Sequence, residues 1–101
     1  MRLKEKNIEE RLISRVESHG GKCYKWISGE TGVPDRIVIW KGGRVVFVET
    51  KKPKGGVLSD MQIYQQDEIK NRDAEVVNIK NYEEIEIFID KMLKGEKLNG
   101  L

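Results

Sequence analysis

Hydrophobic positions recur along the chain with two different periods, which predict both helices and strands. Apolar residues at helical spacing, such as Ile8, Leu12 and Val16, indicate a first helix that Gly20 and Gly21 end. Runs of β-branched residues indicate strands. In chain order we predict a helix over 3–19, strands over 22–27, 36–40 and 44–51, a helix over 59–72, a strand over 75–79 and a helix that Asn81 caps and Gly95 ends.

This order of elements (α-β-β-β-α-β-α) predicts an α/β domain. It corresponds to a mixed sheet with an antiparallel hairpin at Gly42-Gly43 and one parallel crossover strand. The two central strands are apolar at successive positions, so we expect the sheet to be covered on both faces. We expect residues 1–94 to form one domain and residues 95–101 to form a flexible, polar C-terminal tail.

Composition excludes several classes of protein. Charged residues make up 36% of the 101 positions, but the net charge of +2 names no partner. Cys23 is the single cysteine, so a disulfide within the chain is excluded, and one cysteine with one histidine cannot build a structural zinc site. No apolar run is long enough to cross a membrane, and the first residues lack the pattern of a signal peptide. We expect a soluble, cytoplasmic domain.

The pattern around Glu49 carries the first candidate chemistry. Glu49 and Lys51 lie two residues apart at the end of an apolar strand, so their side chains share one face while Thr50 points to the other. Burial of charged groups is unfavourable unless they pair or bind an ion. Alone, this pattern fits an ordinary salt bridge at a strand end as well as a functional site.

Asp35 favours the functional interpretation, provided that the hairpin has the right length. Asp35 follows Pro34 at the entrance of the neighbouring strand, and the proline stiffens this approach. With a two-residue turn, Asp35 would lie opposite Thr50, on the wrong face. A three-residue connection over 41–43 instead places Asp35 opposite Glu49, at a cross-strand separation of about 5 Å. We therefore predict a three-residue or bulged turn.

Two carboxylates this close favour a divalent cation between them, because without one they repel and one must hold a proton. Magnesium prefers one or two carboxylates together with water and phosphate oxygens. Lys51, on the same face, could orient or deprotonate a water molecule. The set therefore fits metal-assisted hydrolysis of a phosphodiester.

Two helical side chains are candidates to join this pair. On the first helix, Glu9 lies at about 100° from Ile8, inside the apolar stripe, whereas Glu10 lies at about 200°, toward solvent. Glu9 is thus the candidate third carboxylate, unless it only borders the core and pairs with a lysine. Gln62 either closes a capping box with Ser59 or points from the first turn of its helix toward the site.

Three segments resemble the VRR-NUC nucleases of the PD-(D/E)xK superfamily. They are Gly32-Val33-Pro34-Asp35-Arg36-Ile37, Val46-Phe47-Val48-Glu49-Thr50-Lys51 and Leu58-Ser59-Asp60-Met61-Gln62. With Ile8-Glu9 and the Gly20-Gly21 stop, the resemblance covers roughly residues 5–90. It implies a restriction-endonuclease-like fold, in a stand-alone protein of the kind found in phages and bacteria.

The resemblance also implies a metal site and a catalytic site. It assigns the binding of Mg²⁺ or Mn²⁺ to Glu9, Asp35, Glu49 and the main-chain carbonyl of Thr50. It assigns catalysis to Asp35, Glu49 and Lys51, with Gln62 supporting the site. Thr50 departs from the family, in which a hydrophobic residue is more usual at this position.

Stand-alone members of the family are similar to Holliday-junction resolvases, which act as homodimers on branched DNA. We therefore expect a Mg²⁺- or Mn²⁺-dependent endodeoxyribonuclease that is selective for branched DNA such as four-way junctions. Two alternatives stay open. One is a flap-directed, end-directed or non-specific nuclease, and the other is a non-catalytic DNA-binding subunit.

Local charge adds a prediction about the substrate. Residues 41–54 include five basic residues and one acid, which favours contact with a DNA backbone, although an ordinary solvated surface has the same pattern. The predicted DNA contacts are Lys25, Arg36, Lys52 and Lys54. No base-reading motif is visible, so we expect recognition by shape. We interpret Trp26, Trp40 and Tyr64 as core or interface residues rather than stacking platforms.

Overall fold

The structure, a computed structural model, describes residues 4–52 and 54–98 and has the predicted order of elements. Along the chain these are α1 (Glu5–Ser18), β1 (Lys22–Lys25), β2 (Arg36–Ile39), β3 (Val45–Thr50), α2 (Asp60–Lys70), β4 (Glu75–Ile79) and α3 (Tyr82–Lys94). Ser59 and Asn81 cap α2 and α3 through their side chains, as predicted. Within the described residues, no helix is long and apolar enough to cross a membrane.

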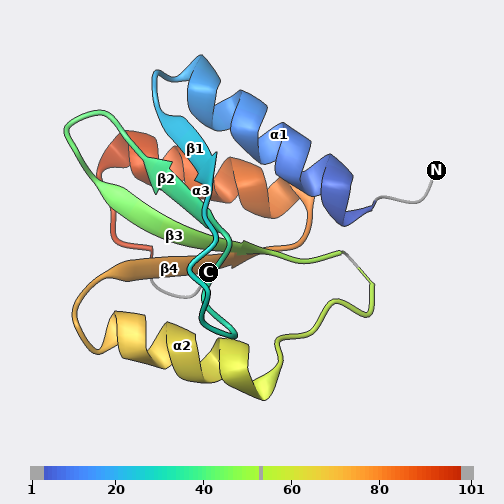
Figure 1. Cartoon of the computed structure of the whole chain (residues 1–101). Helices are drawn as coiled ribbons and strands as arrows, with labels where there is room; N and C mark the ends of the chain where they lie inside the picture. The colour runs from blue at the N-terminus through green and yellow to red at the C-terminus, as the bar shows by residue number, and fades with distance from the viewer. Residues whose placement is uncertain (1–3, 53, 99–101) are drawn as a thin grey trace.

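The four strands form one mixed sheet in the order β1-β2-β3-β4. The β1/β2 and β2/β3 pairs are antiparallel, whereas β3 and β4 are parallel and are connected through α2. Helices α1 and α3 lie together on one face, and α2 lies on the other face alongside β4 (Figure 1). The predicted mixed sheet, with its hairpin and parallel crossover strand, is confirmed.

The core lies between the sheet and the α1/α3 pair. Helix α1, the sheet and helix α3 each contribute side chains with almost no exposure, among them Ile8, Leu12, Val16, Val38, Val46, Val48, Ile85, Phe88 and Ile89. Burial of each such side chain contributes roughly 1.5–3 kcal/mol. This packing holds α1 against the strands and so determines where Glu9, on the adjacent part of its surface, points.

The hairpin between β2 and β3 has the predicted three-residue connection. The Trp40 amide donates to the Arg44 carbonyl at 2.8 Å, and Gly42 and Gly43 both have φ of +86°, which glycine adopts without strain. Arg36 pairs with Val48 in the resulting register. One position further along the two strands, Asp35 therefore lies beside Glu49, and the geometric prediction is confirmed.

The C-terminal segment differs from the predicted flexible tail over its described part. The Leu98 side chain is only 6% exposed and belongs to the core cluster. The Arg44 guanidinium, paired with Glu75, also donates to the Glu96 carbonyl at 2.6 Å. The segment up to Leu98 is thus packed, because one apolar side chain and one carbonyl find partners on the sheet. Residues 99–101 lie outside the described residues.

Candidate active site

Asp35 lies directly before β2, in a backbone that neighbouring strands hold. The Trp26 amide, just after β1, donates to the Asp35 carbonyl at 2.8 Å, and Pro34 is buried. The Asp35 Oδ1 atom is buried and has no hydrogen-bond partner within the described residues. A buried carboxylate oxygen without a protein donor is rare in folded proteins, and such an oxygen suits a cation ligand.

Glu49, at the end of β3, is 5% exposed. Burial raises the pKa of its carboxyl to about 7, and the negative charge of Asp35 adds to this shift. The positive charge of Lys51 and the hydrogen bond from Gln62 oppose the shift without reversing it. Burial and the charge of Asp35 therefore both disfavour the ionised form of Glu49.

Gln62 fulfils both of the roles that the sequence left open. Its side-chain carbonyl accepts from the Ser59 amide at 2.9 Å, while the Ser59 hydroxyl accepts from the Gln62 amide at 3.2 Å, which forms a capping box. Its Nε2 donates to Glu49 Oε1 at 3.2 Å. The start of α2 is thus tied to the carboxylate pair by the same side chain that caps the helix.

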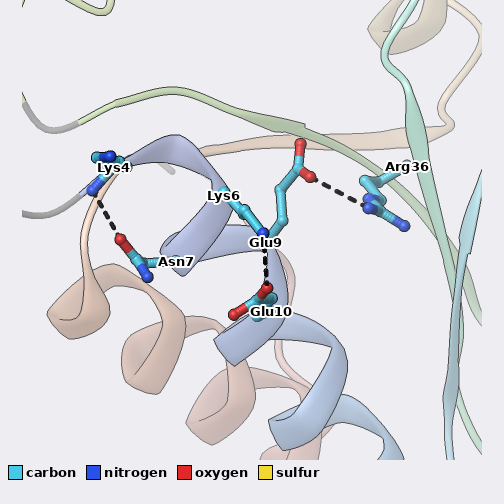
Figure 2. A network of polar contacts seen from close by, with 6 residues as sticks. All are labelled: Lys4, Lys6, Asn7, Glu9, Glu10 and Arg36. Carbon is cyan, nitrogen blue, oxygen red and sulfur yellow. Dashed lines mark hydrogen bonds and ion pairs between the residues drawn. The ribbon is translucent and has the colours of Figure 1, made fainter.

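Glu9 faces inward, as the helical wheel predicted, but it meets other partners. Figure 2 shows its carboxylate extended toward Arg36 of β2, and the distance from Glu9 Oε2 to Arg36 Nη2 is 3.2 Å. The Thr50 hydroxyl donates to Glu9 Oε1 at 3.1 Å. Because Thr50 and Glu49 alternate along β3, Glu9 contacts the sheet face opposite to Glu49. Glu10 is turned to solvent and pairs with Lys6.

The structure therefore brings together two of the three predicted carboxylates. Asp35 and Glu49 are neighbours, whereas Glu9 is held by Arg36 and Thr50. Within residues 4–52 and 54–98, no group of three or more His, Cys, Asp or Glu side chains is placed to hold a metal ion. The predicted three-carboxylate cluster is not assembled, because the nearby guanidinium is a stronger partner for Glu9 than two like charges.

The sequence reasoning missed Glu5, whose charge also raises the pKa of Glu49. Glu5 lies in the first turn of α1, four residues before Glu9, so both glutamates lie on one side of the helix. The same wheel places Glu5 at about 60° from Ile8, inside the apolar stripe. The position of Glu5 on the wheel was thus visible in the sequence, but Glu5 lies one turn before Ile8, the first apolar residue used to define the helix.

The basic residues divide into two groups. Lys25, Lys52 and Lys54 are exposed and Lys51 is half-buried. Arg36, by contrast, has an 11% exposed side chain in its ion pair with Glu9. The prediction that Arg36 contacts DNA is therefore corrected: this guanidinium connects β2 to α1, because its position on the inner face of the strand turns it toward the helix.

The residues at the end of the sheet fit a hard divalent cation. The donors are two carboxylates, of which one has an unpartnered buried oxygen, and oxygen ligands of this kind suit Mg²⁺ or Mn²⁺. One or two carboxylates are enough for magnesium, which keeps several waters. A cation there would relieve the repulsion that raises the pKa of Glu49.

The chain is similar to known proteins in part of its sequence and in its fold. No family model matches the sequence. The chain is 49% identical over 52 residues to "Putative nuclease p44" of Acyrthosiphon pisum secondary endosymbiont phage 1, and the match spans 50% of this chain and 56% of that protein. The chain thus spans little more than half the length of this curated relative.

A solved structure described as "VRR_NUC domain" is similar over nearly the whole fold. The TM-score is 0.80 at 24% sequence identity, and the likeness covers 87% of this chain and 97% of that chain. The fold of this chain is therefore that of a VRR_NUC domain, as its sequence motifs predicted.

Proposed function

We propose that this protein is a VRR-NUC nuclease, a metal-dependent DNA endonuclease that cleaves branched DNA such as four-way junctions. The observation that carries the proposal is the meeting of Asp35 and Glu49, with Lys51 beside them, at one end of a VRR_NUC sheet. The name of the phage relative, a nuclease, supports the same class of activity. The preference for branched DNA rests on the family resemblance.

Asp35, Glu49 and the main-chain carbonyl of Thr50 are the residues that would hold Mg²⁺ or Mn²⁺. When bound, the cation supplies Lewis-acid stabilisation of the charge that develops on the phosphate. Gln62 fixes the orientation of Glu49 through its Nε2. Glu9 holds Arg36 and Thr50 on the other side of β3 and so stabilises the strand ends from which both acids project.

In this proposal Lys51 orients the attacking water molecule. It follows Glu49 on the same face, and its charge lowers the pKa of that carboxyl. Its ammonium orients a water molecule against the phosphate and stabilises the negative charge of the transition state. Exposed Lys25, Lys52 and Lys54 contact the phosphates on either side of the scissile bond.

A homodimer completes the proposal. Symmetric cleavage of a four-way junction needs two active sites that act on two strands, and each described domain carries one pair of site carboxylates. Two-fold pairing of identical chains is the simplest arrangement that provides both. The substrate would then be bound across the dimer rather than by one domain.

The activity test uses labelled four-way junction, flap and linear duplex DNA with Mg²⁺, Mn²⁺ or EDTA. We expect cleavage with either metal and none with EDTA. Lys51→Ala and Glu49→Gln should each lower the cleavage rate by at least ~10²-fold. Matched controls are Lys70→Ala, at the far end of α2, and Glu10→Gln, on the solvent side of α1. Both should leave the rate unchanged.

The distribution of products decides the substrate. Paired symmetric nicks near the branch point support a junction resolvase. Equal cleavage of flap or linear duplex DNA overturns the preference for four-way junctions but still supports the proposed nuclease activity. Cleavage that survives both Lys51→Ala and Glu49→Gln contradicts the proposed site, and DNA binding without any cleavage identifies a non-catalytic subunit.

A further inference from the structure

The sheet face that carries Glu49 is covered over only part of its width. On this face α2 lies alongside β4, at a distance from β1 and β2 (Figure 1). The strand register sets Tyr24 opposite Ile37, and Ile37 opposite Phe47. The Trp26 ring packs against Phe47 with centroids 5.5 Å apart. We call these four side chains, Tyr24, Trp26, Ile37 and Phe47, the open sheet face.

The alternation of side chains along the strands confirms which face this is. Val46 and Val48 are fully buried under α1 and α3, so Phe47 between them points to the opposite side. Glu49, two residues after Phe47, contacts Gln62 of α2 on that side. The open sheet face and the carboxylate pair therefore share one surface of the sheet.

Two aromatic rings of the open sheet face are accessible to solvent. Tyr24 is 51% exposed and Trp26 is 37% exposed, whereas Trp40 is buried in the core. Of the two tryptophans interpreted from the sequence as core or interface residues, only Trp40 is therefore a core residue, and Trp26 is available for stacking. The Trp26 ring packs against Phe47, and the Trp26 backbone amide donates a hydrogen bond to the Asp35 carbonyl at 2.8 Å. Both contacts fix the position of the residue. A tryptophan held in this way keeps an aromatic surface in water directly beside the candidate site.

Positive charge borders the same rings. The Lys22 ammonium lies 5.7 Å from the centroid of the Tyr24 ring and 3.5 Å from Glu17 Oε2. Lys25 pairs with Arg36 in the sheet, so its side chain projects to the other face. Exposed Lys52 lies beyond the site at the end of β3. Exposed aromatic rings with a lysine beside them are a combination that binds single-stranded nucleic acid, since bases stack on the rings and a phosphate pairs with the ammonium group.

We propose that Trp26 and Tyr24 stack unpaired nucleotides of the DNA substrate next to the cleavage site. The proposal rests on the proposed nuclease function and specifies its substrate: DNA with unpaired bases beside the scissile phosphate. In a duplex the flat surfaces of the bases are covered by their neighbours, so only an unpaired nucleotide can present its ring to Trp26. The aromatic pair thus selects branch points at which bases are unstacked.

Intrinsic fluorescence tests this proposal without cleavage. The chain contains two tryptophans, and Trp40 is buried, so an exposed ligand acts mainly on Trp26. The protein is titrated in EDTA with a short oligothymidylate and, separately, with a blunt duplex of the same length. We expect quenching by the oligothymidylate, loss of most of that quenching in Trp26→Phe, and weaker quenching by the duplex.

Affinity gives a second readout. Trp26→Ala should weaken binding of the oligothymidylate at least about fivefold, the lower end of the range for removal of one stacked base. Trp26→Tyr should retain most of the affinity because it keeps a ring. Tyr64→Ala is the matched control, since it removes an exposed aromatic of α2 outside the open sheet face. Circular dichroism establishes that each variant is folded.

The outcomes separate this inference from the proposed function. Unchanged affinity in Trp26→Ala, or equal quenching by duplex and oligothymidylate, overturns the stacking proposal even if the protein cleaves DNA. Quenching and weakened binding support it even if no cleavage is found. A change of the solution mass from dimer to monomer in Trp26→Ala, with unchanged oligothymidylate binding, overturns it in favour of a contact between copies. If Trp26→Ala does not fold, Tyr24→Ala and the wild-type titrations decide.

Discussion

Glu49 is buried beside a second acid, and both circumstances favour its neutral form. In the unfolded chain the carboxyl titrates near its ordinary pKa of 4.5, whereas in the folded chain its pKa is about 7. Between these values the folded state binds more protons, so the free energy of unfolding falls as pH rises through this window. Above about pH 7, the ionised Glu49 carboxylate therefore lowers the free energy of unfolding of the metal-free protein by its full amount.

Glu49→Gln should therefore stabilise the metal-free protein at high pH. Glutamine keeps the shape and cannot ionise, so at about pH 8 the variant should exceed the wild type in free energy of unfolding by roughly 1–3 kcal/mol. At about pH 4 the difference should disappear, because the wild-type carboxyl is then neutral in both states. Urea unfolding in EDTA measures both values, and Glu10→Gln, on the solvent side of α1, is the control. A difference independent of pH would contradict the assigned cause.

The candidate site shows which side-chain placements can be derived from spacing. Asp35, Glu49 and Lys51 were predictable because strand alternation and hairpin length determine which side chains share a face. Arg36 was assigned to DNA because a count of local charge does not show which way a guanidinium points. In the structure the Arg36 guanidinium pairs with Glu9, and this ion pair joins segments that are far apart in the chain.

The start of α2 is positioned by a close approach of the loop that precedes β2. Gly32 has φ of +88°, and a Cβ at this position would overlap the carbonyl of Met61. The loop and the first turn of α2 therefore touch backbone to backbone, next to Gln62. This contact explains why glycine is needed in the segment that leads to Asp35.

A pair of glycine variants separates the close approach from the backbone conformation. Gly29 also has a positive φ, of +83°, but a Cβ there would meet open space. Gly29→Ala should cost about 1–2 kcal/mol of unfolding free energy for its left-handed backbone alone. Gly32→Ala should cost at least about 2 kcal/mol more and should lower nuclease activity, since α2 and Gln62 must shift. Thermal or urea unfolding gives the comparison, and equal losses in the two variants would contradict this account.

Helices and strands were predicted well because their signals are local. Periodicity, capping residues and paired glycines placed each element within a few residues of its bounds. The dual role of Gln62 was left open, since the capping box is a local pattern but its contact with Glu49 joins α2 to β3. Contacts of that kind depend on how the elements pack.

The C-terminal segment contributes to the fold as a whole. Leu98 is buried in the core that α1, the sheet and α3 share, and the Glu96 carbonyl accepts from Arg44. Neither contact has a sequence signal, because one apolar residue among polar neighbours is typical of a free tail.

Leucine substitutions on either side of Gly95 test this packing. Leu98→Ala should lower the free energy of unfolding by roughly 2–4 kcal/mol, since it removes a buried side chain. Leu93→Ala, at a position that is 58% exposed on α3, should change it by less than about 1 kcal/mol. Chemical denaturation measures both. Equal, small effects would show that the segment after α3 is free in solution.

The sequence alone determined the order of elements, because it follows from short-range periods and capping residues. The three-residue hairpin was predicted from the requirement that Asp35 and Glu49 share a face, and the strand register confirmed it. Tertiary structure alone decided that Glu9 pairs with Arg36 and Thr50, that Leu98 joins the core and that Trp26 and Tyr24 stay exposed beside the site. These outcomes depend on which surfaces the helices cover. That choice is made by the packing of the whole chain, so no local pattern records it.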